Sequence, residues 1–352
     1  MKILIVKLSS IGDIIHTLPA LSAIKKTLPE ADISWLAEKR AAEILRDNPL
    51  LENLIEVDTK ALRQTDKFGK TLKIAGRQFK DLRSEKFDLS IDFQGLFKSA
   101  SLAKIARAEK HYGFSKENLR EPGSRIFLSK TIEVEPQQNI IFKNIELAEK
   151  SLRDFLGDKN FKLDRENLEF PIKSEEKNRA EAEKIIGQTG ENFAILNPAG
   201  GWWTKLWHAE NYGRLADRLW NELNIVPVVS TAPNERELAE KVLKNSSSGR
   251  TVSVTPSLKG FYELAGRAEI YVGGDTAPTH LAVAAKCPVV GIFGPTEWWR
   301  NGSINEKDFE VGRKDINCRV NCHRRTCDRW ICMDIPVETV FKAVKERLGL
   351  RT

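Results

Sequence analysis

Short runs of apolar residues recur along the chain and alternate with longer amphipathic segments. The apolar runs span residues 3–6, 33–36, 54–57 and 89–92, then 193–196, 225–229, 270–272 and 289–293. Between them, as over 18–28 and 212–223, apolar residues recur every three or four positions, which predicts helices with one buried face. Strands that alternate with helices predict an α/β fold with parallel sheets and right-handed crossovers.

A polar stretch separates the two sets of predicted strands. At 352 residues the chain exceeds the size at which a single core stops growing, so two domains are expected. We place an N-terminal domain at 1–165, a linker at 166–190 and a C-terminal domain at 191–335. A last helix, within 336–352, follows Pro336 and is expected to pack back across the space between the domains or onto either of them.

Composition narrows the class of protein. Hydrophobic residues make up 41% and charged residues 30%, as in an ordinary soluble enzyme, and no run of eighteen apolar residues predicts a membrane span. The chain starts directly on a predicted strand without a signal-peptide pattern, so we expect a cytoplasmic protein. The formal net charge of +7 favours anionic partners, whether nucleic acid, phosphorylated substrates or an anionic membrane surface.

The turn after the first strand is the strongest candidate for chemistry. It covers residues 7–13, consists mostly of small residues and ends in Asp13, where an amphipathic segment begins. Open α/β sheets bind ligands at the carboxyl ends of their strands, which is where this carboxylate is expected. Asp13 is therefore a candidate general base, and the alternative is that it only caps its helix.

A second turn suits an anion. The strand at 270–272 ends in two glycines and is followed by Asp275, Thr276 and a helix that begins near Pro278. Free N–H groups and the positive end of the helix dipole would face an anion there, and His280 adds a hydrogen-bonding side chain. Capping by Asp275 and Thr276, and an ordinary half-buried role for His280, are the alternatives.

Two charged residues follow neighbouring strands of the same half. Lys205 comes after a glycine turn and lies among three tryptophans, which we assign to packing, and its ammonium suits a diphosphate. Glu235 follows the strand at 225–229, where a carboxylate accepts bonds from a ribose diol. The alternatives are a solvated surface lysine and a charge in the first turn of a helix.

Other motifs are absent or ambiguous. The sequence lacks Gly-x-Gly-x-x-Gly after a strand, a phosphate-binding loop ending in Gly-Lys-Ser/Thr, and Gly-x-Ser-x-Gly, which argues against dehydrogenases, ATPases and serine hydrolases. Four cysteines lie close together near the C-terminus. In the reducing compartment predicted for this protein, disulfides between them are disfavoured. Their spacing fits a zinc site only partly, so a metal or iron–sulfur site and a plain thiol loop both remain open. These cysteines are Cys318, Cys322, Cys327 and Cys332.

A basic segment covers residues 60–83. Lysines and arginines recur there every three or four positions beside an apolar face, and glutamate is nearly absent. The pattern is typical of an amphipathic helix with one cationic side. It is either a solvated surface helix or a face that binds a phosphorylated or membrane-embedded acceptor.

Taken together, these motifs resemble the bacterial heptosyltransferases of glycosyltransferase family 9, with the closest likeness to the heptosyltransferase I branch. The resemblance covers nearly the whole chain. It rests on residues 7–19, 92–100, 197–207, 274–280 and 291–296. It implies two facing Rossmann-like domains of the GT-B type with a cleft between them, and an acceptor-binding N-terminal and a nucleotide-sugar-binding C-terminal domain.

The resemblance also implies an inverting transfer of heptose from ADP-L-glycero-D-manno-heptose to Kdo of the lipopolysaccharide inner core. Asp13 matches the catalytic base, and no cofactor is required because no carboxylate pair of metal-binding spacing stands out. The acceptor, Kdo-lipid A, places the enzyme as a peripheral protein on the inner face of the inner membrane, and we expect a monomer. The implied donor-binding residues are Thr204, Lys205, Glu235, Asp275, Thr276, Ala277 and His280, and the implied acceptor-binding residues are Ser10, Gly12, Arg63, Lys98 and Arg120.

Three other hypotheses compete with this one. The first is a heptosyltransferase of the second-heptose (II) type, and the second is a sugar-nucleotide epimerase of the same architecture, which would need no lipid acceptor. The third is a nucleic-acid-binding protein that uses the basic segment. We expect no nucleic-acid partner, because the two aromatic residues of that segment, Phe68 and Phe79, belong to its apolar face and the strand ends suit a small anion.

Overall fold

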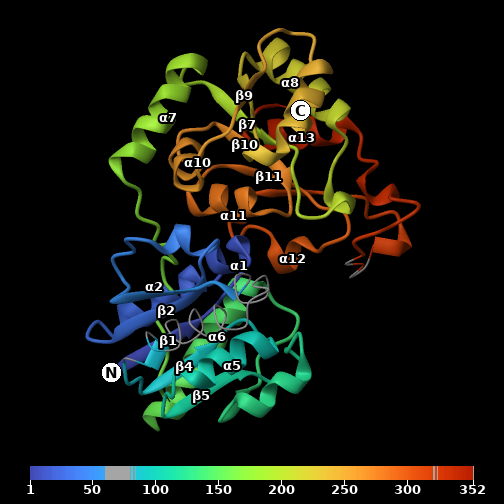
Figure 1. The fold of residues 1–352 in the computed structure, drawn as a ribbon. Coiled ribbons are helices and arrows are strands. Elements are labelled where there is room, and N and C mark those ends of the chain that lie inside the picture. The colour runs from blue at the N-terminus through green and yellow to red at the C-terminus, as the bar shows by residue number, and fades with distance from the viewer. Residues whose placement is uncertain (60–79, 81, 84, 320–321, 323, 352) are drawn as a thin grey trace, which may run out of the picture. The chain divides into compact units, whose positions relative to one another are not determined.

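The computed structural model describes residues 1–59, 80, 82–83, 85–319, 322 and 324–351. The chain divides into two compact units, Met1–Lys173 and Ser174–Thr352, which run from blue to green and from green to red in Figure 1. Most of the basic segment predicted at 60–83, including Arg63, lies outside the described residues. Each unit is described by itself below.

Within its described residues, unit 1 holds one parallel sheet in the order β3-β2-β1-β4-β5-β6. The central strand, β1, has four consecutive buried residues, because helices cover both faces of a parallel sheet and leave no solvated side. The strands are β1 (Lys2–Val6), β2 (Asp32–Glu38), β3 (Asn53–Val57), β4 (Leu89–Asp92), β5 (Lys110–Phe114) and β6 (Lys130–Ile132).

Helices and short turns connect these strands. A long helix, α6, packs against α2 and also contacts β4, β5 and β6, whereas α5 packs on β4 and on the 3₁₀ helix η2. Their apolar faces complete the core that the strands begin. The helices are α1 (Ile11–Ile15), α2 (Leu18–Thr27), α5 (Phe97–Ile105) and α6 (Ile140–Leu156), and η2 spans Pro122–Phe127.

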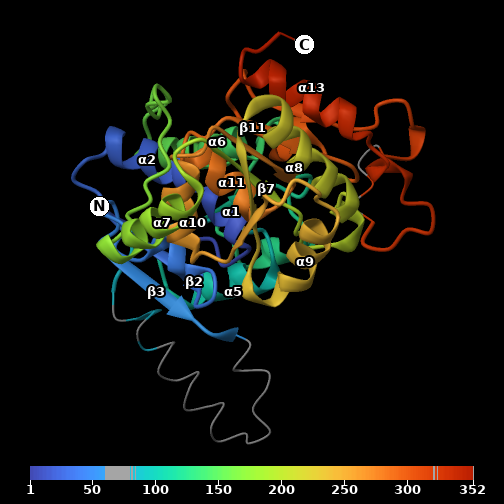
Figure 2. The same cartoon turned by 90° about the horizontal axis from the view of Figure 1, so that it is seen from above.

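Unit 2 repeats the same strand order in its described residues, as β12-β11-β10-β7-β8-β9. Its strands are β7 (Phe193–Asn197), β8 (Val226–Ser230), β9 (Val252–Val254), β10 (Ile270–Gly274), β11 (Val289–Ile292) and β12 (Phe309–Val311). Its helices are α7 (Glu176–Thr189), α8 (Ala209–Leu223), α9 (Arg236–Lys244), α10 (Leu258–Ala265), α11 (Ala277–Ala284), α12 (Trp298–Asn301) and α13 (Val337–Arg347). Figure 2 shows α8 and α9, which contact one another, from above.

Both sheets carry a topological switch point. In each, the chain starts in the middle, runs to one edge and returns to continue on the other side, so β1 lies between β2 and β4, and β7 between β8 and β10. Ligands of open α/β sheets bind beyond the carboxyl ends of the strands at such a point. The switch points therefore locate the candidate site in each unit.

Two predicted segments outside the sheets contain helices of unit 2. The residues expected as a linker, 166–190, contain the helix α7, which packs on α10 and whose Glu181 accepts a hydrogen bond from the backbone N of Ser257 at 3.0 Å. Polar residues dominate α7, but Ala182, Ile185 and Ile186 give it a narrow buried stripe. The predicted last helix is α13, and it packs on α8, β11 and β12 of its own unit.

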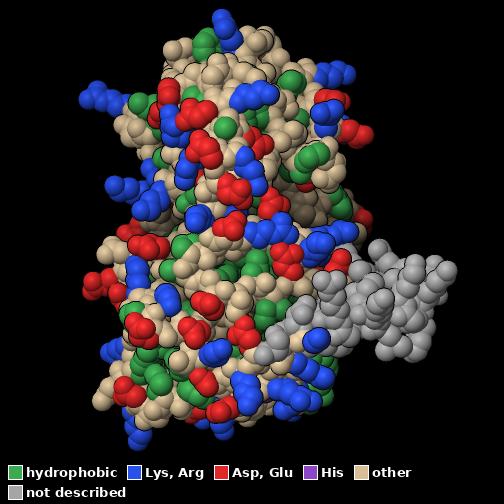
Figure 3. Space-filling view, turned by 60° about the vertical axis from the view of Figure 1, so that its left-hand side comes forward, with side chains coloured by type: hydrophobic (Ala, Val, Ile, Leu, Met, Phe, Trp, Pro, Cys, Tyr) green, Lys and Arg blue, Asp and Glu red, His purple; other side chains and the backbone are tan. Residues whose placement is uncertain are grey.

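The surface gives no sign of a membrane span. None of the described helices combines the length and apolar character that crossing a bilayer requires. On the face drawn in Figure 3, lysine and arginine side chains alternate with aspartate and glutamate side chains. Mixed charge of this kind is typical of a solvated surface.

Candidate active site

Asp13 lies beyond the carboxyl end of β1, in the first turn of α1. Its Oδ2 accepts hydrogen bonds from the backbone N of Ser10 at 2.8 Å and from Ser10 Oγ at 3.0 Å. Ser10 precedes the helix, so the pair forms a reciprocal cap that fixes the carboxylate. The half-buried side chain is thus held rigidly and keeps capacity to accept a further proton or hydrogen bond.

The charge of Asp13 is set by its neighbours. Burial by itself raises the pKa of the Asp13 carboxyl, but the Lys7 ammonium, the hydrogen bonds from Ser10 and the nearby His16 together outweigh it. Its pKa therefore lies below the ordinary value, and the group is ionised at neutral pH. An ionised, oriented carboxylate is what a general base requires.

A buried network behind the turn holds it in place. Lys7 is only 5% exposed, and its Nζ donates to the carbonyl of Phe93 at 2.8 Å. Gln94 Oε1 accepts from the backbone N–H groups of Leu8 and Ser9 at 3.1 and 3.2 Å. These hydrogen bonds hold the residues after β4 against the turn that contains Asp13. Sequence reasoning did not assign Gln94 a role, although its place directly after a buried strand was a usable signal.

Asp92, at the end of β4, organises the same region. It is 1% exposed and accepts from the backbone N of Gln94 at 2.8 Å and from Ser99 Oγ at 2.9 Å. Burial raises its pKa to about 6, against the effect of these hydrogen bonds. Asp92 thus shapes the turn between β4 and α5 and points away from solvent.

The predicted acceptor-binding residues separate into groups. Ser10 and Gly12 belong to the turn of Asp13, with Gly12 buried. Lys98 donates from Nζ to Glu38 Oε1 at 2.7 Å and to Thr59 Oγ1 at 3.2 Å, so its ammonium is held in an ion pair. Arg120 is exposed on the segment before η2, and Arg63 lies outside the described residues.

In unit 2 the structure brings three predicted residues together. Lys205 Nζ lies 2.6 Å from Asp275 Oδ2, although 70 residues separate them in sequence. His280 Nε2 lies 3.3 Å from the other carboxylate oxygen of Asp275. The ring of Trp202 lies 4.3 Å from the lysine nitrogen, so the ammonium is also held over an aromatic face. The result is a fixed cation beside the start of α11.

Asp275 contacts both Lys205 and His280. Burial by itself raises the pKa of Asp275, but the hydrogen bond from His280 and the charge of Lys205 lower it far below its ordinary range. Asn301 adds a contact from Nδ2 at 3.3 Å, a partner that sequence reasoning missed. Since Asp275 stays ionised, it orients Lys205 rather than exchanging protons itself.

The helix α11 begins beside this cluster. Thr276 is its N-cap residue and Ala277 its first residue, and among the described residues the Thr276 side chain makes no capping bond. The free N–H groups of the first turn and the positive end of the helix dipole lie at this end of α11, and Lys205 contacts Asp275 directly before it. A phosphate group fits this combination of an ammonium and a helix N-terminus.

Two predicted donor-binding residues have local partners. Thr204 is 1% exposed, and its hydroxyl donates to the carbonyl of Arg324 at 2.8 Å. Glu235 closes its own turn, η4 (Pro233–Glu235), by accepting from the backbone N of Ala232 at 3.0 Å. Its half-buried carboxylate lies past the carboxyl end of β8.

The cysteine loop packs beside the Lys205 turn. Trp330 Nε1 donates to the carbonyl of Thr204 at 3.0 Å, and the rings of Trp203 and Trp330 lie 5.0 Å apart. Among the described residues, no three His, Cys, Asp or Glu side chains are arranged to hold a metal ion. Burial raises the pKa of Cys332 to about 11, with Cys322 and Cys327 adding to the effect.

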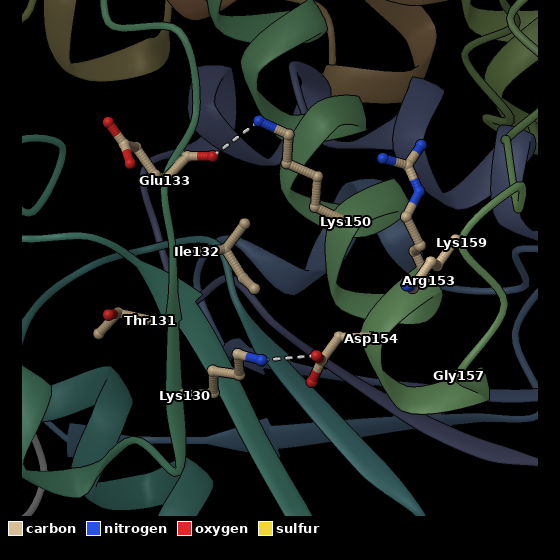
Figure 4. A pocket seen from close by; sticks show the side chains of 9 residues that line it. All are labelled: Lys130, Thr131, Ile132, Glu133, Lys150, Arg153, Asp154, Gly157 and Lys159. Carbon is tan, nitrogen blue, oxygen red and sulfur yellow. Dashed lines mark hydrogen bonds and ion pairs between the residues drawn. The ribbon is translucent and has the colours of Figure 1, made fainter.

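A surface pocket of about 460 Å³ lies elsewhere on unit 1 (Figure 4). Lys130 there pairs with Asp154 at 2.5 Å, and Lys150 donates to the carbonyl of Glu133 at 2.9 Å. The pocket starts at the amino end of β6, opposite to the strand ends that carry Asp13, and three of its basic residues, Lys130, Lys150 and Arg153, have partners. We therefore do not assign it to the reaction. Its lining residues are Lys130, Thr131, Ile132, Glu133, Lys150, Arg153, Asp154, Gly157 and Lys159.

Comparison with known proteins identifies the family of this chain. A model of glycosyltransferase family 9 (heptosyltransferase) matches residues 75–329. A lipopolysaccharide heptosyltransferase 1 from Pseudomonas aeruginosa is 29% identical over 335 residues, which cover 93% of this chain and 87% of that protein. A solved structure of Escherichia coli heptosyltransferase WaaC with ADP superimposes with a TM-score of 0.77 at 23% identity, covering 99% of this chain and 100% of that one. WaaC with ADP-2-deoxy-2-fluoro heptose gives 0.72 at 24% identity, over 88% and 93%.

Two sheets of Rossmann strand order, matched over nearly the whole chain by the WaaC structure with ADP, define the GT-B fold, and the family match defines a glycosyltransferase. This architecture and the predicted enzyme class are thereby confirmed. The chain belongs to glycosyltransferase family 9, the heptosyltransferases.

Proposed function

We propose that this heptosyltransferase transfers heptose from ADP-L-glycero-D-manno-heptose to Kdo of the lipopolysaccharide inner core, on Kdo-lipid A. The observation that carries the proposal is the pair of Lys205 and Asp275 at the start of α11, in a chain of this family. The relative named as a lipopolysaccharide heptosyltransferase 1 and the WaaC structures with ADP and a fluorinated ADP-heptose support this donor and acceptor.

Unit 2 holds the donor in this proposal. Lys205 neutralises the diphosphate, and the N–H groups at the start of α11 donate hydrogen bonds to its oxygens. As the bond between the anomeric carbon and the diphosphate breaks, negative charge grows on the leaving ADP. A cation that Asp275 already orients stabilises this charge without reorganisation. Glu235, Thr204, Thr276, Ala277 and His280 complete the donor-binding set.

Unit 1 supplies the base. Asp13 takes a proton from the acceptor hydroxyl while that oxygen attacks the anomeric carbon, which inverts its configuration. The pKa of Asp13 lies below its ordinary value, and an acceptor that displaces water from this carboxylate would raise the pKa toward that of an effective base. Ser10, Gly12, Lys98, Arg120 and Arg63 bind the phosphorylated acceptor, with Lys98 exchanging Glu38 for a phosphate.

Three further properties belong to this proposal. The enzyme works as a monomer without a cofactor, so transfer should persist in EDTA. It acts in the cytoplasm as a peripheral protein on the inner face of the inner membrane, because its acceptor is a membrane lipid. Nucleic acid is not among its partners.

The variant Asp13→Asn tests the mechanism. Loss of a positioned base should lower kcat by about 10²–10⁴-fold, with the affinity for ADP unchanged by calorimetry, because the donor residues belong to unit 2. Asp32→Asn is a matched control, since this acid is exposed at the amino end of β2. Turnover of Asp13→Asn close to that of the control would remove Asp13 from the catalytic role.

The choice of substrates is tested separately. Mass-spectrometric transfer assays with a panel of nucleotide sugars should show product only with ADP-heptose, and on Kdo-lipid A. Product only on an acceptor that already carries one heptose would assign the enzyme to the second-heptose type. A changed sugar configuration without any acceptor would instead identify an epimerase.

A further inference from the structure

An apolar patch is exposed on unit 1, between α5 and η2. Ile126 is 72% exposed and Phe97 46%, which is unusual for side chains of this size, and Pro122 is exposed beside them. The rings of Phe97 and Phe127 lie 6.4 Å apart in an edge-to-face arrangement. We call Phe97, Pro122, Ile126 and Phe127 the apolar patch.

The backbone of η2 brings these side chains together. In a 3₁₀ helix, residues three apart share a face, so Gly123 and Ile126 are neighbours. A Cβ at Gly123 would lie 2.6 Å from the Phe97 ring, so this ring lies directly on the glycine. Phe97 and Ile126 therefore project from one continuous surface, where a larger residue at 123 would lift the ring away.

The chain segment that forms the patch is basic. Residues 95–130 contain eight lysines and arginines but three acids, so this span carries five of the seven net positive charges of the chain. Among its exposed cations, Arg125 belongs to η2 and Arg120 lies just before it, whereas Lys110 and Lys130 begin β5 and β6 at the opposite, amino ends of the strands.

The patch also lies at the functional edge of its sheet. Phe97 begins α5, which follows the carboxyl end of β4, and its backbone N donates to Glu121 Oε2 at 2.7 Å, just before η2. Lys98 and Arg120 are both assigned above to acceptor binding; Lys98 is the second residue of α5, and Arg120 lies two residues before η2. A surface that contacts a bilayer here would hold the strand ends of unit 1 near lipid headgroups.

We propose that the apolar patch and the basic chain segment that forms it dock unit 1 onto a bilayer that contains anionic phospholipid. Ile126 and Phe97 enter the boundary between headgroups and acyl chains, while the cations contact lipid phosphates, the combination that interfacial segments use. The excess of positive charge favours this occupant over a second copy of the same basic chain. The proposal rests on the proposed function only in that a lipid-borne acceptor gives the docking its purpose.

Vesicle binding tests the proposal directly. Co-sedimentation of the full chain with phosphatidylethanolamine vesicles containing phosphatidylglycerol should show binding that weakens when phosphatidylglycerol is omitted or salt is raised. Ile126→Ser and Arg125→Ser should each weaken binding, the former at least about fivefold, from the loss of buried apolar area. Phe142→Ser is the matched control, since Phe142 is an exposed aromatic residue, 37% accessible, on α6 of the same unit.

Activity separates docking from catalysis. Ile126→Ser should transfer heptose to a water-soluble Kdo acceptor at the wild-type rate but to a vesicle-embedded acceptor more slowly. Vesicle binding of Ile126→Ser equal to that of Phe142→Ser would overturn the docking proposal and leave the proposed function intact. Patch-dependent vesicle binding without transfer to any Kdo acceptor would sustain docking and overturn the function. Concentration-dependent dimers that Ile126→Ser abolishes, with vesicle binding unchanged, would make the patch a subunit interface and overturn docking.

Discussion

The side-chain oxygen of Gln94 lies 3.1 Å from the backbone N of Leu8, where it accepts a hydrogen bond across 86 residues of sequence. A second bond, from the N–H of Ser9, lies at 3.2 Å. These contacts join the turn after β4 to the turn after β1, which holds Asp13. The proposed base is therefore positioned by a residue that has no acid–base chemistry of its own.

Replacing Gln94 should disturb turnover more than donor binding. Gln94→Leu removes the acceptor for two N–H groups, loosens the turn of Asp13 and should lower kcat by about tenfold or more, since small misplacements of reacting groups are costly. The affinity for ADP, measured by calorimetry, should stay the same. Gln94→Glu retains an acceptor oxygen and should recover part of kcat. Equal rates for Gln94→Leu and wild type would show that the turn holds without this residue.

Asp92 should make stability depend on pH. Its folded-state pKa of about 6 exceeds the ordinary value near 4, so the native state keeps a proton that the unfolded state has lost. The free energy of unfolding contributed by this group is therefore greatest below about pH 4 and falls by roughly 2–3 kcal/mol as the pH rises through 6. Urea unfolding between pH 4 and 7 measures this slope. Asp92→Asn should flatten it, and an unchanged slope in the variant would contradict the assignment.

Removing Lys205 should affect both stability and donor use. Lys205→Met leaves the buried Asp275 without its nearest cation, which should lower the free energy of unfolding by up to about 3 kcal/mol. It should also raise the KM for the nucleotide sugar by about tenfold or more, because a phosphate loses a charged partner.

A second variant separates the two effects of Lys205. Lys205→Met combined with Asp275→Asn removes the unpaired charge, so it should recover stability without recovering donor affinity. Thermal unfolding and steady-state kinetics on both variants provide the comparison. If donor affinity returned together with stability, Lys205 would act through folding alone.

The cysteines should differ in reactivity. Backbone N–H groups of Trp330 and Arg329 lower the pKa of Cys327, whereas burial raises that of Cys332 to about 11. At pH 8, iodoacetamide should modify Cys327 about tenfold faster than Cys332, because a larger fraction of Cys327 is thiolate. The difference is not larger because a thiolate of lower pKa is also a weaker nucleophile. Peptide mass spectrometry over a time course measures both rates. Cys287, buried and with a raised pKa, should react slowly, and faster labelling of Cys332 than of Cys327 would be inconsistent with these environments.

The sequence predicted the strands whose apolar runs are unbroken. All eight are present, but four others were missed. β6, β9 and β12 have three residues each and form sheet edges, where one side lacks a neighbour and few apolar residues are needed. β5 begins with Lys110 and His111, and its pairing with β4 is not visible in local sequence.

The sequence predicted which residues of the candidate site lie at the same sheet edge, but not which of them touch. Glycine turns and acids after strands showed which residues share a sheet edge, because strand ends of a parallel sheet meet there. The direct contact of Lys205 with Asp275 depends on the paths of two loops, and the engagement of Thr204 by Arg324 depends on a distant segment. Local patterns contain neither piece of information.

The packing of α13 limits how this protein can be engineered. Phe341 and Val344 are at most 1% exposed and belong to the same core as Val290 and Ile292 of β11, while Arg347 holds Asp308 at 2.8 Å. A truncation that removes this helix would expose the apolar residues of the unit 2 sheet that it covers and promote aggregation. An affinity tag joined after Arg351, which is exposed, would leave that packing intact.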